Sequence, residues 1–273
     1  MKNITFNSDW KNSWKDSYYH DLLDIYGDKS NLGYVYHYAN RRKYTIDFIE
    51  KVATKGAKVL DVAAAQGNFS LLLAELGYEV TWNDLREDLV GYVKLKYEYG
   101  NISFCPGNIF DLNLDCCYDV VLITEIIEHV AHPDEFLRKI AHLVKPGGHI
   151  ILSTPNGQYF RNSLPKFSDC PDPSKFEEIQ YKPDADGHIF LLHLDELETL
   201  ADRTGLILKE TKLFTNFLTR GGLKTEAVLK YLPRSFVEGF EIWTESLPLF
   251  LSKRINIGTL ALLARPNENI QIN

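Results

Sequence analysis

Two acidic residues and a histidine stand close together near the middle of the chain, as Glu125, Glu128 and His129. Their spacing of i, i+3 and i+4 puts all three side chains on one face if the segment forms a helical turn. Two carboxylates and an imidazole on a buried face are unfavourable unless they pair or bind a cation. The pattern is therefore consistent with a divalent metal site built from nitrogen and oxygen ligands. The alternative is that Glu128 and His129 only cap a helix and hold the loop.

The segments around these residues alternate between apolar strands and helices. Tyr118 to Thr124 is an apolar strand, and Pro133, followed by two acidic residues, marks the start of a helix. The other strands are expected at residues 59–62, 78–82, 102–105, 149–154, 206–214 and 255–263. This alternation predicts an α/β fold in which the acidic residues and the histidine lie at the carboxyl edge of the sheet.

A second stretch with chemical potential runs from Lys58 to Ser70. It predicts a short strand, a turn of small residues, and a helix from about Gly67. Small residues let a ligand approach the backbone, and the helix N-terminus offers free N–H groups to an anion. The turn lacks G-x-G-x-x-G, so a nicotinamide-dependent dehydrogenase is not expected.

The turn reads Asp61-x-Ala63-x-Ala65-x-Gly67, which resembles motif I of class I S-adenosylmethionine-dependent methyltransferases, usually D-x-G-x-G-x-G. The string from Tyr118 to Asn156 closely resembles the methyltransferase family that contains the ubiquinone-pathway O-methyltransferases. The match covers roughly residues 55 to 210. It implies a Rossmann-like, seven-stranded, mostly parallel sheet with helices on both faces and an antiparallel last strand. Two glycines of the motif are alanine here, and alanine disfavours positive φ.

The resemblance implies S-adenosylmethionine as the cofactor. Asp84 stands 23 positions after Asp61 and is expected to bind the ribose hydroxyls. The carbonyl of Asn108 is expected to accept a hydrogen bond from the adenine amine. Arg41 or Arg42 would reach the methionine carboxylate, or else belong to a solvated basic face. The expected cofactor-binding residues are Asp61, Ala63, Ala65, Gly67, Asp84, Leu85, Asn108, Ile109, Thr124 and Arg42.

The E-x-x-E-H spacing is similar to the metal site of the plant small-RNA 2′-O-methyltransferases. Their fourth ligand is a histidine in a downstream H-x-F segment, which His188-Ile-Phe190 matches here, with His193 as a second choice. The resemblance thus implies Mg, Mn, Zn or Fe held by Glu125, Glu128, His129 and His188. Without a metal, His129 or His188 would act as the general base. The expected catalytic residues are His129, His188 and Glu128.

Charge and composition narrow the partners of the chain. Its 273 residues carry a net charge of −7, which argues against a long contact with a nucleic acid backbone. No signal-peptide pattern and no membrane-spanning apolar run is present, and the four cysteines match no zinc or disulfide spacing. A cytoplasmic protein that neither enters a membrane nor binds nucleic acid, and that takes a small-molecule acceptor, is therefore expected.

The expected domain organisation has three parts. Residues 1–50 form an N-terminal helical lid, residues 51–265 a methyltransferase domain with insertions at 157–187 and 217–252, and residues 266–273 a tail. The second insertion carries many apolar side chains, so we expect it to cover the acceptor pocket or to form a homodimer contact. The expected activity is O-methylation of a secondary metabolite or a sugar. The alternatives are metal-independent N- or C-methylation and a non-catalytic protein that binds S-adenosylmethionine.

Overall fold

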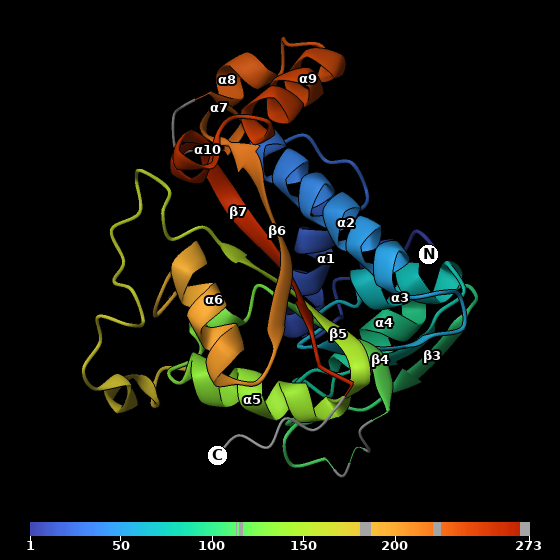
Figure 1. Cartoon of the computed structure of the whole chain (residues 1–273). Helices are drawn as coiled ribbons and strands as arrows, with labels where there is room; N and C mark the ends of the chain where they lie inside the picture. The colour runs from blue at the N-terminus through green and yellow to red at the C-terminus, as the bar shows by residue number, and fades with distance from the viewer. Residues whose placement is uncertain (113, 115–116, 181–186, 221–224, 268–273) are drawn as a thin grey trace.

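The computed structural model describes residues 1–112, 114, 117–180, 187–220 and 225–267. Its centre is a seven-stranded sheet in the order β3-β2-β1-β4-β5-β7-β6 (Figure 1). The strands are β1 (Lys58–Val62), β2 (Glu79–Trp82), β3 (Asn101–Phe104), β4 (Tyr118–Thr124), β5 (Val144–Pro155), β6 (Ile207–Asn216) and β7 (Asn256–Ala264). Only β7 runs antiparallel to its neighbours, β5 and β6. The predicted Rossmann-like sheet with an antiparallel last strand is confirmed.

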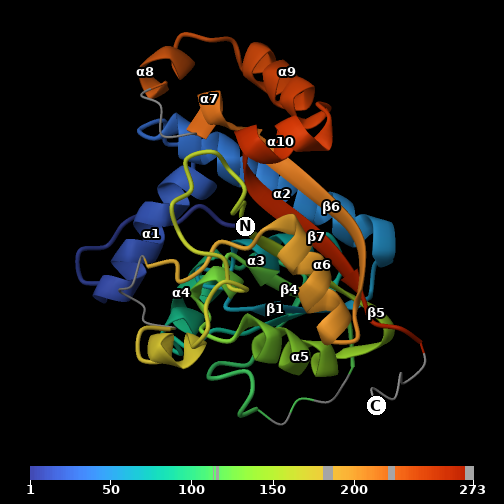
Figure 2. The same cartoon turned by 60° about the vertical axis from the view of Figure 1, so that its left-hand side comes forward.

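Helices cover both faces of this sheet, so the central strands β1, β4 and β7 are buried on both sides along most of their length. One face carries α2 (Leu32–Val52), α3 (Asn68–Glu75) and α4 (Leu89–Lys96). The other face carries α5 (Pro133–Leu143) and α6 (Leu194–Arg203). Figure 2 shows α5 and α6 on the side of the sheet opposite α2. The sheet and helices thereby hold the loops at the carboxyl ends of β1, β2 and β4 in fixed positions.

The N-terminal helix α1 (Asn12–Asp24) packs against α4 and α2 through a buried polar cluster. The ammonium of Lys96 lies 2.7 Å from Asp21, and both side chains are fully buried. The hydroxyl of Tyr92 donates to the same carboxylate at 2.7 Å. Separating the partners of a buried ion pair would leave each charge buried and uncompensated, which is strongly unfavourable. The pair therefore holds both side chains in place. The helix is therefore firmly attached to the sheet domain.

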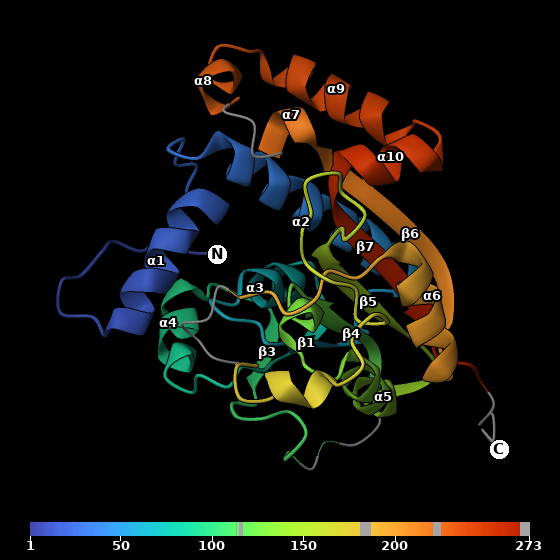
Figure 3. The same cartoon turned by 90° about the vertical axis from the view of Figure 1, so that its left-hand side faces the viewer.

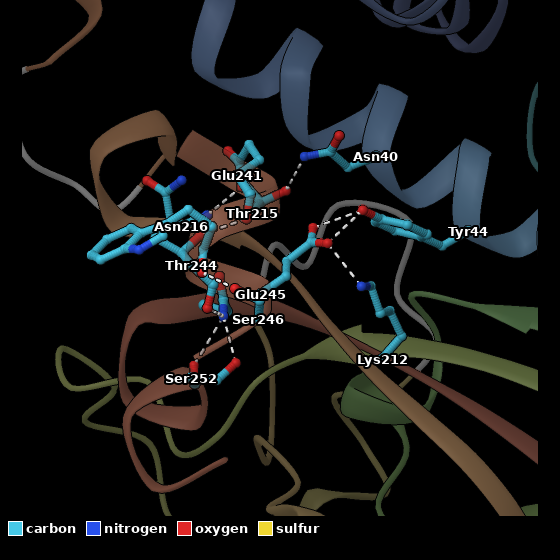
Figure 4. A network of polar contacts seen from close by, with 12 residues as sticks. Asn40, Tyr44, Lys212, Thr215, Asn216, Glu241, Thr244, Glu245, Ser246 and Ser252 are labelled. Carbon is cyan, nitrogen blue, oxygen red and sulfur yellow. Dashed lines mark hydrogen bonds and ion pairs between the residues drawn. The ribbon is translucent and has the colours of Figure 1, made fainter. Parts of the chain in front are cut away.

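The second insertion forms α7 (Phe217–Arg220), α8 (Glu226–Leu229), α9 (Arg234–Glu245) and α10 (Leu249–Ile255) between β6 and β7. These helices lie together beyond the ends of β6 and β7, beside α2 (Figure 3). Figure 4 shows the polar contacts that attach α9, which we call the α9 anchor. The hydroxyl of Tyr44 lies 2.8 Å from Oε1 and 2.6 Å from Oε2 of Glu245 and donates to this carboxylate. Lys212 forms an ion pair with Oε2 of Glu245 at 2.8 Å. Glu241 accepts from the backbone N–H of Asn216 at 2.9 Å.

The outer side of this insertion is unusually apolar for a surface. Several large side chains are more than half exposed, namely Tyr231, Phe236, Ile242, Trp243, Leu249 and Phe250. No helix among the described residues is both long and apolar enough to span a lipid bilayer.

One predicted strand boundary differs from the structure, and parts of the tail and of the insertions lie outside the described residues. The strand expected at residues 149–154 is longer in the structure, because β5 begins at Val144 and pairs irregularly with β4 over its first residues. Most of the expected tail, residues 268–273, lies outside the described residues, as do residues 181–186 and 221–224 of the two insertions.

Candidate active site

A cavity of about 880 Å³ lies at the carboxyl ends of β1, β2 and β4, where α1 and α2 approach the sheet. This volume is in the range of small-molecule and cofactor sites. Eight of the expected cofactor-binding residues line it, namely Asp61, Ala63, Ala65, Asp84, Leu85, Asn108, Ile109 and Thr124. Gly67 and Arg42 are not among the described residues that line it.

The turn after β1 uses left-handed backbone at all three small positions of its motif. The φ angles are +54° at Ala63, +46° at Ala65 and +73° at Gly67. A Cβ atom on Gly67 would lie 2.9 Å from both methyl groups of Val93. Gly67 is thus required for the start of α3, while the two alanines occupy backbone positions that glycine would adopt with less strain.

Asp84 joins this turn to the loop after β2. Its carboxylate accepts from the backbone N–H of Ala65 at 2.8 Å and pairs with Arg86 at 3.0 Å. The side chain is 4% exposed and lines the cavity. The carboxylate therefore shapes the turn, and its proposed contact with a ribose would have to be shared with Arg86.

Asp61 and Asn108 lie at two further points of the cavity. Oδ2 of Asp61 accepts from Ser70 at 2.5 Å, while Oδ1 has no partner. Burial raises the pKa of Asp61 to about 7, and the charge of Asp84 adds to the effect. The amide oxygen of Asn108 accepts from the backbone N–H of Phe110 at 3.2 Å, which occupies one of its two lone pairs.

Arg41 is the arginine of α2 that reaches the cavity, so the choice of Arg42 needs correction. Arg41 lines the cavity, and its Nη1 lies 3.1 Å from Oε2 of Glu125. The guanidinium lies over the ring of Tyr38, 5.3 Å from its centre. Arg42 follows on the same helix, and one helical residue turns a side chain by about 100° onto a different face.

The helical turn expected from Glu125 onward does not begin there. Glu125 has a φ of +54°, and the only helical piece of this loop is the short 3-10 helix η1 (Ile127–His129). Besides Arg41, Glu125 contacts Ser153, whose hydroxyl donates to it at 2.8 Å. Glu125 thus contacts α2 and β5 and is not part of the group formed by Glu128, His129 and His188, so its expected role as a metal ligand needs correction.

Glu128, His129 and His188 come together, with one ligand atom of each within 4.8 Å of the others. The amide of Ile189 donates to the carbonyl of Glu128 at 2.7 Å, which brings the segment after the first insertion to η1. The rings of His129 and His188 lie 4.9 Å apart between their centres. His193, the second choice, instead begins α6 as its N-cap residue.

Glu128 is fully buried, and only part of its carboxylate is bonded. Oε2 accepts from Thr154 at 3.0 Å, and Oε1 has no partner. Burial, followed by the charge of Glu125, raises the pKa of Glu128 well above its ordinary range. A carboxylate oxygen without a partner beside two imidazoles is a donor set that suits a divalent transition metal ion.

The sequence did not predict that residues of α1, α2 and the first insertion line the cavity. Asp24, Tyr34 and Tyr38 line the cavity from the N-terminal segment, and Glu177, Ile179 and Gln180 line it from the first insertion. The side-chain oxygen of Gln180 accepts a hydrogen bond from the backbone N–H of Ala131 at 3.1 Å. One available signal was the pair of acidic residues at 21 and 24, spaced to share a helix face. No described residue of 217–252 lines the cavity.

Known proteins share this fold and part of this sequence. A ubiquinone biosynthesis O-methyltransferase of Coxiella burnetii is 33% identical over 132 residues, which are 43% of this chain and 56% of that protein. Another, from Xanthomonas euvesicatoria, is 37% identical over 116 residues, covering 40% and 48%. The chain spans about half the length of the curated relatives it matches.

Solved structures agree in fold at low sequence identity. An S-adenosylmethionine-dependent methyltransferase from Mesorhizobium loti aligns over 81% of this chain and 96% of its own, with a TM-score of 0.53 and 14% identity. One from Methanosarcina mazei aligns over 81% and 97%, with a TM-score of 0.52 and 16% identity. A family model described as a methyltransferase domain matches residues 36–210, more than half of the chain. The chain therefore belongs to the methyltransferase domain family.

Proposed function

We propose that this protein transfers a methyl group from S-adenosylmethionine to a hydroxyl of a small molecule, with assistance from a divalent metal. One observation carries the proposal. His129 lines the large cavity at the carboxyl edge of the sheet and also belongs to the Glu128–His129–His188 group. In this proposal the donor site and the group that deprotonates the hydroxyl are therefore adjacent.

The donor half of the proposal is supported by the family and by the shape of the cavity. When bound, S-adenosylmethionine supplies an electrophilic methyl group, so the main task of the protein is to position the two reactants. In this proposal Asp84 holds the ribose, and the main chain of the turn from Ala63 to Gly67 lies close to the cofactor. Arg41 neutralises the methionine carboxylate.

The acceptor half rests on the buried carboxylate and the two histidines. Glu128, His129 and His188 would hold a divalent ion, which when bound supplies Lewis acidity that lowers the pKa of an acceptor hydroxyl. The unpartnered Oε1 of Glu128 fits a cation, since a bound cation offsets the burial of the charge. Without an ion, His129 or His188 takes the proton from the hydroxyl.

The names of the relatives support O-methylation, and the charge of the chain favours a small acceptor over a nucleic acid. A second candidate is a non-catalytic protein that binds S-adenosylmethionine. It is favoured by the two alanines in left-handed positions of the turn, which strain the cofactor loop. The expectations of a homodimer and of a cytoplasmic location stay predictions, and sedimentation analysis tests the first.

The test combines metal analysis with methyl transfer. Protein purified without chelator is analysed for bound metal and is then incubated with labelled S-adenosylmethionine and a panel of phenols, catechols and sugars. We expect about one divalent ion per chain, transfer to a hydroxyl, and loss of transfer in EDTA that is reversed by one added metal. Full transfer in EDTA with no stoichiometric metal would contradict metal assistance. Binding of S-adenosylmethionine without transfer to any acceptor would favour the non-catalytic candidate.

A further inference from the structure

The wall of the cavity that α1 and α2 supply carries three buried polar atoms without a partner. They are Oδ1 of Asp24, the hydroxyl of Tyr38 and Nε of Arg41, and all three side chains line the cavity. Asp24 is 8% exposed and Tyr38 is 4% exposed. Because buried polar atoms are normally hydrogen-bonded, groups of a bound ligand are the natural partners for this wall.

The carboxylate of Asp24 is held firmly from behind. Its Oδ2 accepts from Gln66 at 3.0 Å and from Asn68 at 3.3 Å. The amide oxygen of Asn68 accepts from the buried ammonium of Lys96 at 2.6 Å, which sets the orientation of that amide. Burial raises the pKa of Asp24, and Tyr34 and Arg41 oppose this only in part. The bonds to Gln66 and Asn68, with a side-chain hydrogen bond from Tyr34, hold the carboxylate, and Oδ1 is the oxygen left without a partner within hydrogen-bond distance.

Arg41 supplies the opposite charge on the same wall. Its Nη1 pairs with Glu125, and its Nε has no partner. A ligand group with an ammonium and a carboxylate on one carbon would complement both side chains. We propose that Asp24 binds the α-ammonium group of the methionine part of the methyl donor while Arg41 takes its carboxylate. The inference rests on the proposed function, in which S-adenosylmethionine is the donor.

Asp61 is the other cavity carboxylate with an unpartnered oxygen, but its surroundings differ. It ends β1, and the charge that acts on it is that of Asp84, the residue expected to hold the ribose. The charge that acts on Asp24 most strongly is that of Arg41. The backbone carbonyl of Asp61 accepts from the N–H of Asn83, the neighbour of Asp84, at 3.0 Å. In this proposal Asp61 therefore lies toward the nucleoside part of the donor, and Asp24 lies toward its amino-acid part.

The experiment is a ligand-and-variant cycle measured by calorimetry. The ligands are S-adenosylhomocysteine and its deamino analogue, which has hydrogen in place of the α-ammonium group. The proteins are the unchanged chain, Asp24→Asn, and Asp16→Asn as a matched control, since Asp16 is an exposed aspartate of the same helix. Thermal unfolding of each protein reports whether the variants are folded.

We expect the unchanged chain and Asp16→Asn to bind S-adenosylhomocysteine at least tenfold more tightly than the deamino analogue. In Asp24→Asn this ratio should fall to within twofold, because only the affinity for the ammonium-bearing ligand drops. An unchanged ratio in a folded Asp24→Asn variant would overturn the inference. Equal affinity of the unchanged chain for the two ligands would overturn it without any variant. Failure of the unchanged chain to bind S-adenosylhomocysteine at all would instead remove the proposed function itself.

Discussion

Glu245 in the α9 anchor and Glu128 beside the cavity are both almost fully buried, and their surroundings differ. Glu245 has a cation and a phenol as partners, in Lys212 and Tyr44. Glu128 has one neutral hydroxyl, that of Thr154, and one oxygen without a partner. A buried charge that is paired within the chain holds structure, whereas an unpaired one keeps a proton or takes a cation from outside.

Glu241 and Asp24 extend the comparison, because each leaves one carboxylate oxygen without a partner. Glu241 lies in the α9 anchor and is not among the described residues that line the cavity. We therefore expect its buried carboxylate to be neutralised by a proton. Burial accordingly raises the pKa of Glu241 to about 7. Asp24 lines the cavity, so a ligand cation can reach it. Glu241 thus differs from Asp24, which lines the cavity, and from Glu128, which lies beside His129 and His188.

The largest effect is expected for Glu128→Gln. The variant loses the charged ligand atom of the metal group, so methyl transfer should fall about 100- to 10,000-fold, the range for a lost acid–base or metal-activating group. Calorimetry should give an unchanged affinity for S-adenosylhomocysteine, because Glu128 is not among the residues that line the donor cavity. Glu238→Gln, an exposed position of α9, is the control. Normal turnover by Glu128→Gln would assign Glu128 a structural role like that of Glu245.

Breaking the α9 anchor should change stability and leave cofactor binding alone. Lys212→Met leaves the carboxylate of Glu245 with Tyr44 but without its cation, and because Lys212 is 32% exposed the free energy of unfolding should fall by about 1–3 kcal/mol. Denaturant unfolding measures this change, and Lys209→Met at an exposed position of β6 is the matched control. A loss of affinity for S-adenosylhomocysteine in Lys212→Met would show that the anchor and the cavity are coupled after all.

The pH dependence of stability should distinguish Glu241. Its pKa is about 7 in the folded protein and near 4.5 when unfolded, so the unfolded state binds fewer protons between these values. Stability should therefore fall as pH rises from 4.5 through 7, by up to about 3 kcal/mol. Glu241→Gln removes this penalty, so the variant should match the unchanged chain at pH 5 and exceed it at pH 8 in urea unfolding. An equal difference at both pH values would mean that Glu241 does not change protonation between pH 5 and pH 8 in the folded protein, which contradicts the raised pKa.

The sequence predicted the sheet because its signals are local. β1, β4 and β7 are largely apolar runs and the other strands alternate with predicted helices, so the seven strands and the position of Asp84 after β2 followed from local patterns. The motif I resemblance likewise predicted the turn that the left-handed angles of Ala63, Ala65 and Gly67 now describe. Local preferences that agree with the global fold favour one native structure over competing compact states.

The departures arise where tertiary contacts override local preference. Nothing in Thr-Glu-Ile at positions 124–126 indicates positive φ, which is uncommon for any residue but glycine, and Ser153 and Arg41 hold Glu125 in it. Asp24 lies 37 positions before Asp61 in sequence, and the packing of α1 on α2 and α4 brings it to the cavity. Contacts between distant segments of this kind leave no periodic signal in the chain.

The smallest effect is expected at the cofactor turn, where the backbone itself is strained. A left-handed residue with a Cβ atom costs about 1–2 kcal/mol, and Ala65, at a φ of +46°, is fixed there by the carboxylate of Asp84. Ala65→Gly relieves this cost but adds about 0.5–1 kcal/mol of chain entropy, so a net gain of about 1 kcal/mol, or about 2–4 °C in Tm, is expected. Ala64→Gly, one residue earlier and without positive φ, should lose stability. If both variants were destabilised equally, the turn would not be a source of strain, and the case for weakened cofactor binding would lose its basis.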